Sequence, residues 1–87
     1  MDWEDTLAHI RHIEIPAADL ARWEAVAERL LSVTPAVLLE VSDLWADPSK
    51  HRIGRAANAA RFAASIADEP LKTEAVALAE ELEQRSV

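Results

Sequence analysis

Apolar residues recur along most of this chain with the three- and four-residue spacing of an amphipathic α-helix. The clearest case runs from Pro16 or Ala17 to about Ser32. There, glutamate and arginine side chains lie opposite an apolar stripe formed by Leu20, Trp23, Ala27, Leu30 and Leu31. The pattern predicts a helix that buries one face.

The same spacing predicts further helices over residues 2–12, 34–46, 49–67 and 71–85. Residues 13–15 alternate between apolar and polar like a short extended piece. Pro16 disfavours a helical conformation in the residue before it, so we expect a break between the first two helices.

Proline and small polar residues mark the connections between these segments. Thr34 precedes Pro35, either Asp47 or Ser49 is placed to cap the helix that follows Pro48, and Asp68-Glu69-Pro70 precedes the last helix. Short connections force consecutive helices to pack against each other. With 87 residues there is room for one domain. The sequence therefore predicts an all-α, single-domain chain over residues 1–87, a compact bundle of four to five short helices with tight Pro-containing turns.

The alanine-rich segment 49–67 is expected to be the central helix. Ile53, Ala57, Ala60 and Ala64 fall near one line on its surface, whereas Ala59, Phe62 and Ile66 fall on roughly the opposite side. The apolar sector spans about 220°, which predicts burial on two sides. Either both sides are covered within one chain, or the side of Phe62 and Ile66 packs against a second copy in a homodimer.

Charge separates along the chain in the same place. The net charge is −7, and residues 1–48, 49–67 and 68–87 contribute −7, +4 and −4 respectively. A negative protein repels the phosphate backbone of nucleic acids and anionic membranes, which makes both poor candidates as partners. The basic helix is expected to form ion pairs with its acidic neighbours; the alternative is that its bases face a phosphate or an acidic partner.

The sequence contains few patterns that indicate an enzyme, so catalysis would require residues that meet only in three dimensions. There is no cysteine or tyrosine, no glycine-rich phosphate loop, and no serine at a recognisable spacing from a histidine and a carboxylate. The acidic start, MDWEDTLAHI, differs from a signal peptide, and no apolar run approaches the ~20 residues of a membrane span. We expect a cytoplasmic protein that is not an enzyme and needs no cofactor.

One alternative to a protein-binding function is a site for a metal ion or for phosphotransfer that uses histidine. His9 and His12 share a helix face at a spacing that suits a metal ligand pair, although two histidines do not complete a site. His51, followed by Arg52, Ile53, Gly54 and Arg55, resembles the phosphorylated-histidine helix of histidine phosphotransfer domains. Those domains place lysine and then glycine three and four residues beyond the histidine, whereas here Gly54 and Arg55 hold these positions.

A second alternative is a helix-turn-helix regulator of DNA. The two helices that flank residues 45–49 would form the motif, with Lys50, Arg52 and Arg55 at the start of the recognition helix. The negative net charge and the apolar residues Ile53, Ala56 and Ala57 oppose this interpretation.

The function that the sequence favours is binding of another protein, with a basic protein as the candidate partner, through an acidic surface of the first two helices and the last. Inhibitors, antitoxins, immunity proteins and adaptors are often of this kind, because a negative surface steers association with a basic target. Three tryptophans lie on apolar stripes. They are expected mainly in the core, with Trp3 or Trp45 as an exposed anchor. The candidate partner-binding residues are Trp3, Glu24, Glu28, Trp45, Arg55, Phe62 and Ile66.

Overall fold

A computed structural model describes residues 14–86 of the chain. Within this range the fold is all-helical and forms a compact bundle, as the sequence predicts. The elements are α2 (Ala17–Arg29), the 3₁₀-helix η1 (Leu30–Ser32), α3 (Ala36–Asp43), α4 (Lys50–Ile66) and α5 (Leu71–Arg85). The predicted helix over residues 2–12 lies outside the described residues, together with Trp3, His9 and His12.

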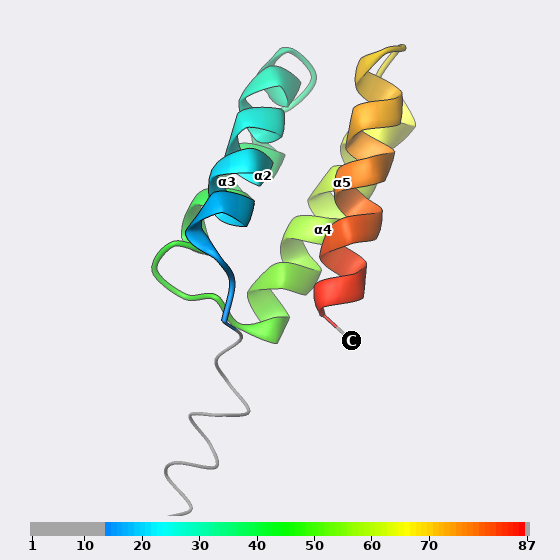
Figure 1. The fold of residues 1–87 in the computed structure, drawn as a ribbon. Helices are drawn as coiled ribbons and strands as arrows, with labels where there is room; N and C mark the ends of the chain where they lie inside the picture. Colours follow the sequence, from blue (N-terminus) through cyan, green and yellow to red (C-terminus); the bar gives the residue numbers. More distant parts are fainter. Residues whose placement is uncertain (1–13, 87) are drawn as a thin grey trace, which may run out of the picture.

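The bundle consists of two helical hairpins that lie side by side. Figure 1 shows α2 with α3 in one hairpin and α4 with α5 in the other. The closest packing is between α4 and α5, followed by that between α3 and α4, whereas α2 and α5 contact each other less extensively. The alanine-rich helix α4 therefore joins the two hairpins.

Polar side chains fix where the helices begin. Ser49 is the N-cap of α4, and its Oγ accepts a hydrogen bond of 3.2 Å from the backbone N–H of Arg52. The Oγ1 of Thr34 accepts a bond of 3.2 Å from the N–H of Ala36. The bond to Ser49 satisfies a backbone donor that a helix start leaves without an internal partner, which confirms the capping role predicted for Ser49. The N-cap of α3 is Pro35, so Thr34 bonds to the first residue of the helix without being its cap.

The third helix is shorter than the pattern predicts. α3 ends at Asp43, and residues 44–46 form a turn instead of continuing to Ala46. The N–H groups of Leu44 and Trp45 bond to carbonyls three residues back, at 3.0 and 3.2 Å. Such a tightened last turn closes a helix and redirects the chain, here toward the cap at Ser49.

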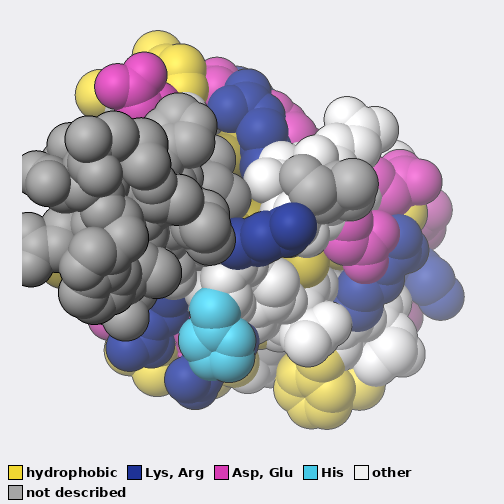
Figure 2. All heavy atoms as spheres, turned by 90° about the horizontal axis from the view of Figure 1, so that it is seen from below, with side chains coloured by type: hydrophobic (Ala, Val, Ile, Leu, Met, Phe, Trp, Pro, Cys, Tyr) yellow, Lys and Arg dark blue, Asp and Glu magenta, His cyan; other side chains and the backbone are white. Residues whose placement is uncertain are grey.

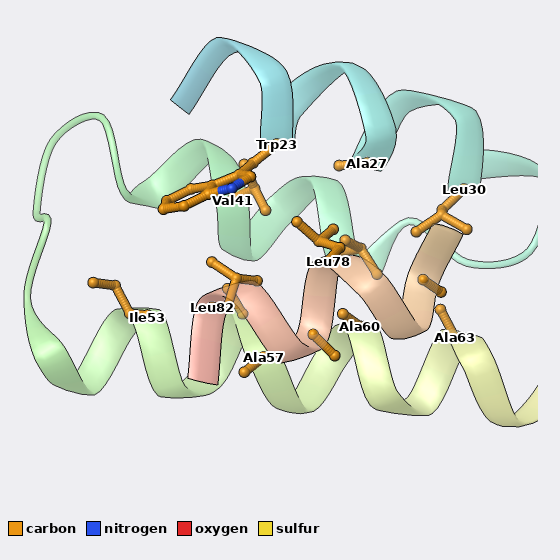
Figure 3. Packing of buried hydrophobic residues seen from close by; sticks show 14 of the residues in the cluster. Trp23, Ala27, Leu30, Val41, Ile53, Ala57, Ala60, Ala63, Leu78 and Leu82 are labelled. Carbon is orange, nitrogen blue, oxygen red and sulfur yellow. The ribbon is translucent and has the colours of Figure 1, made fainter. Parts of the chain in front are cut away.

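The core lies where the two hairpins meet, and its largest member is Trp23. This side chain has no exposed surface. Figure 3 shows Trp23 and Ala27 of α2 and Leu30 of η1 pointing toward the residues of the other hairpin, which include Leu78 and Leu82. Complete burial of a side chain as large as leucine contributes about 1.5–3 kcal/mol to folding. The predicted core position of Trp23 is therefore confirmed.

Alanine accounts for the close approach of α4 to its neighbours. Its inward side consists of Ile53, Ala56, Ala57, Ala60, Ala63, Ala64 and Ala67, all buried. On the facing side of α5, Ala75 and Ala79 are buried beside Leu78 and Leu82. Small side chains let helix axes approach to about 8 Å, the lower end of the usual range, and the leucines fill the remaining space.

Residues 14–86 bury α4 on one side and leave the opposite side exposed. The buried residues of this helix span about 120° at 3.6 residues per turn, whereas Phe62 is 54% exposed and Ile66 is 53% exposed. Leu31, predicted on the buried stripe of the second helix, is also exposed. In both places the apolar stripe is wider than the neighbouring helices can cover.

Candidate interaction surface

The arginines of α4 are engaged by acidic residues of the adjacent elements. Arg52 lies 3.4 Å from a carboxylate oxygen of Asp43 and 3.4 Å from one of Asp47. Arg55 lies 3.2 Å from Glu40 of α3. The expected ion pairing of the basic helix with its acidic neighbours is thereby confirmed on this side.

The other side of α4 makes the same kind of contact with α5. Arg61 donates two hydrogen bonds to Glu83, of 2.7 and 3.0 Å, and this bidentate contact holds the pKa of the Glu83 carboxyl below its usual range. Figure 2 looks onto the end of the bundle where α4 begins, and there Lys and Arg side chains lie next to Asp and Glu side chains.

A second set of ion pairs closes the seam between α2 and α5. Arg22 donates to Glu81 at 2.7 Å and to Asp19 at 3.1 Å, and Arg85 donates to Asp19 at 2.7 Å. The pKa of Asp19 is lowered, mainly by the hydrogen bond from Arg22 and next by the one from Arg85. The hydrogen bond from Arg22 also lowers the pKa of Glu81. Further along the seam, Arg29 contacts Glu74 at 2.8 Å.

Some carboxylates have no such partner. Within residues 14–86, no lysine, arginine or histidine lies within 4 Å of the carboxylate oxygens of Glu14, Glu24, Glu28, Asp68, Glu69 and Glu80. Glu69 instead accepts hydrogen bonds from the backbone and hydroxyl of Thr73. The surplus negative charge of the described chain is therefore concentrated on a few positions, of which Glu24 and Glu28 lie four residues apart on one side of α2.

Trp45 lies beside this pair of glutamates. Its side chain is 47% exposed, and its indole N–H donates a hydrogen bond of 3.2 Å to Oε2 of Glu24. Leu38 precedes Trp45 by seven residues and is half-buried, and the exposed Leu31 follows Glu28 by three. We refer to Glu24, Glu28, Leu31, Leu38 and Trp45 together as the Glu24–Trp45 face.

The candidate residues from the sequence thus divide between two surfaces. Glu24, Glu28 and Trp45 come together on the flank formed by α2 and α3. Arg55, Phe62 and Ile66 lie instead on the outward side of α4. Leu31, Leu38 and Leu39 were not among the surface residues predicted from the sequence. The exposure of Leu39 was predictable, because three consecutive apolar residues at 37–39 cannot all face inward on one helix.

The basic candidates for DNA contact are only partly available. Lys50 is exposed and makes no ion pair with the described residues. Arg52 and Arg55 form ion pairs with carboxylates of α3 and of the turn that follows it. Contact with a phosphate would require both arginines to leave these partners. This arrangement argues against a recognition helix.

Metal and phosphate chemistry find little support among the described residues. No three histidine, aspartate or glutamate side chains of residues 14–86 converge in a way that would hold a metal ion. His51 is exposed in the first turn of α4 (cyan in Figure 2). His9 and His12 lie outside the described residues.

The hollows on the surface are shallow. A groove of about 150 Å³ lies between α2 and α5 and is lined by Arg22, Trp23, Val26, Glu74, Ala77, Leu78 and Glu81. It is smaller than the roughly 300–1,000 Å³ of typical small-molecule sites. A wider hollow of about 380 Å³ lies at the end of the bundle, between η1 and the α4–α5 turn, and its charged residues are Asp68 and Glu69.

None of the helices in residues 14–86 combines the length and the apolar character that a membrane span requires.

Comparisons of the chain with protein-family models, with curated proteins and with solved structures found no match.

Proposed function

We propose that this chain is a non-enzymatic binding protein that recognises a basic partner protein through the Glu24–Trp45 face. The observation that carries this proposal is the hydrogen bond between the exposed indole of Trp45 and Glu24, on a flank where Glu28 also lacks a cationic partner among the described residues. Tryptophan is the residue type most enriched at energetically dominant positions of protein interfaces.

Electrostatics supports a basic partner. The arginines of the described chain are held by its own acids, whereas Glu24 and Glu28 keep their charge available to a second molecule. Two neighbouring carboxylates attract lysine and arginine over a distance of about a Debye length and speed the encounter with a basic surface.

The apolar members of the face supply the contact area. Trp45 is about half exposed, and Leu31 and Leu38 extend the apolar surface along the same flank. The bond to Glu24 restricts the rotation of the indole before binding, which lowers the entropy lost in the complex. A partner with an apolar centre and a lysine- or arginine-rich rim, such as an amphipathic basic helix, matches this surface.

A capture experiment with matched variants tests the proposal. The tagged chain is incubated with lysate of its source cells, and the retained proteins are identified by mass spectrometry. The supporting result is a basic protein that is lost with Trp45→Ala and with the double variant Glu24→Gln, Glu28→Gln. Glu80→Gln is the control, because this exposed glutamate also lacks an ion pair but lies on α5. Equal retention by all variants would show that this face is not used.

Salt dependence separates the two parts of the face. Capture by the wild type should fall as the salt concentration rises, and the double glutamine variant should show a weaker dependence. Trp45→Ala keeps both carboxylates and should lower affinity at every salt concentration. A wild-type complex insensitive to salt would contradict the proposed role of the carboxylates.

A further inference from the structure

The outward side of α4 carries an apolar stripe that the described part of the chain leaves exposed. It consists of Arg55, Ala59, Phe62 and Ile66, at spacings of four, three and four residues. This is the spacing with which one helix packs along another in a coiled coil. Phe62 and Ile66 are 54% and 53% exposed, which is unusual for side chains of their size.

α3 borders this stripe at one end, where Glu40 is bound to Arg55. We refer to Arg55, Ala59, Phe62 and Ile66 as the Phe62 face. Its two large apolar side chains, each about half exposed, leave on the order of 200 Å² of apolar surface.

Local charge favours a second copy of the chain as the occupant of this face. Two molecules with a net charge of −7 repel each other through their acidic surfaces. At the Phe62 face, Arg55 is paired with Glu40 at one end, and α4 itself contains no acidic residue. The carboxylates of Asp68 and Glu69 lie at the other end, in the hollow that Ile66 also lines. In an antiparallel pair this acidic end lies opposite the basic first half of the partner's α4, so the charges of two copies are complementary here.

The residue order of the stripe is complementary to itself. When two α4 helices cross antiparallel about a two-fold axis midway between positions 59 and 62, Phe62 faces the partner's Ala59 and Arg55 faces the partner's Ile66. The ring of Phe62 then meets a small side chain, and the methylene stem of Arg55 covers an apolar one. A two-fold axis repeats each contact, so a single complementary pair is used twice.

We propose that this chain self-associates as an antiparallel, two-fold symmetric dimer through the Phe62 face. The surface differs from the Glu24–Trp45 face, which lies on the other flank of α3. Interfaces that bury less than about 1,200 Å² in total belong to weak and transient complexes. The dimer should therefore dissociate on dilution in the micromolar range.

Sedimentation equilibrium over a concentration series tests self-association. From about 10 µM to about 1 mM, a range that brackets a weak interface of this kind, the wild-type mass should rise from that of the monomer toward twice that value. Phe62→Glu should remain monomeric. Ala25→Glu is the matched control, because it adds the same charge at an exposed apolar position of α2 that belongs to neither face, and it should still associate. A monomeric wild type, or equal association of Phe62→Glu, would overturn the proposal.

Two substitutions at one position test the antiparallel register. In that register residue 66 faces Arg55 of the partner subunit, so Ile66→Glu gains an ion pair and should retain measurable association, whereas Ile66→Lys places like charges together and should abolish it. In a parallel dimer residue 66 faces itself, and both variants would be monomeric. Equal behaviour of the two variants would therefore refute the register. Melting curves should show that every variant is folded, since the altered side chains are exposed.

Discussion

The guanidinium carbon of Arg85 lies 5.8 Å from the centroid of the buried Trp23 ring. The same guanidinium donates a hydrogen bond of 2.7 Å to Asp19, so the last turn of α5 is fixed to both the core and the first turn of α2. A cation above the face of an indole ring is attracted by the negative charge of the ring's π electrons. This contact closes the seam between α2 and α5, which pack less extensively than α3 with α4 or α4 with α5.

Arg85→Ala should lower the free energy of unfolding by about 1 kcal/mol, because it removes a cation–π contact together with an ion pair. The measurement is urea denaturation followed by circular dichroism. Lys72→Ala is the control, because Lys72 is exposed and makes no ion pair with the described residues, and its effect should stay within about 0.5 kcal/mol. Equal stability of the two variants would show that Arg85 does not hold the seam.

Ala60→Leu should destabilise the fold by about 1–3 kcal/mol, since three extra carbon atoms must enter the tightly packed contact between α4 and α5. Ala60 has no exposed surface. Ala77 is exposed on α5, so Ala77→Leu adds the same volume outside the core and should change stability little. If both variants unfolded at the same urea concentration, close helix packing would not be the role of the alanine-rich helix.

Local signals were sufficient to predict most of the fold. The start of α4 followed from Ser49, whose hydroxyl accepts a hydrogen bond from the backbone N–H three residues further on. The inward position of Trp23 followed from helical spacing. The end of α3 was misplaced, because Leu44 is buried and fits the helical pattern although it lies in the turn.

The surfaces could not be predicted to the same extent. Helical spacing shows that Phe62 and Ile66 lie opposite Ile53, but it does not show whether a neighbouring helix covers them. That depends on how many helices surround α4, which is a property of the tertiary packing. For the same reason, the pairing of Trp45 with Glu24 across 21 residues left no local signal in the sequence.

The ion pairs of α4 predict that this protein does not bind DNA. Arg52 and Arg55 are held by acids of α3 and the following turn, and the net charge of −7 opposes approach to phosphate. A fluorescent duplex at about 50 mM salt should show no change in anisotropy up to about 100 µM protein, conditions that detect even non-specific binding. If the wild type bound the duplex and the double variant Arg52→Glu, Arg55→Glu did not, the result would contradict this prediction and support a helix-turn-helix function.

Stability should fall on acidification, because Arg22 and its neighbours lower the pKa of the carboxyl groups at the seam. Asp19 and Glu81 have pKa values below their ordinary 3.8 and 4.5 in the folded chain. Between the folded and unfolded pKa values, the unfolded chain binds more protons than the folded one, so protons favour unfolding there. The contribution of these groups is complete above pH 4.5 and is lost as the pH falls through their folded pKa values.

The variant Arg22→Gln isolates this contribution. It removes the hydrogen bonds to both Asp19 and Glu81, so their folded pKa values should rise toward those of the unfolded chain. The free energy of unfolding of this variant, measured with urea at a series of pH values, should depend less steeply on pH below 4.5 than that of the wild type. Lys50→Gln, at an exposed residue that makes no ion pair with the described residues, should keep the wild-type slope. Equal slopes for the wild type and Arg22→Gln would mean that the seam carboxylates titrate alike in the folded and unfolded chains.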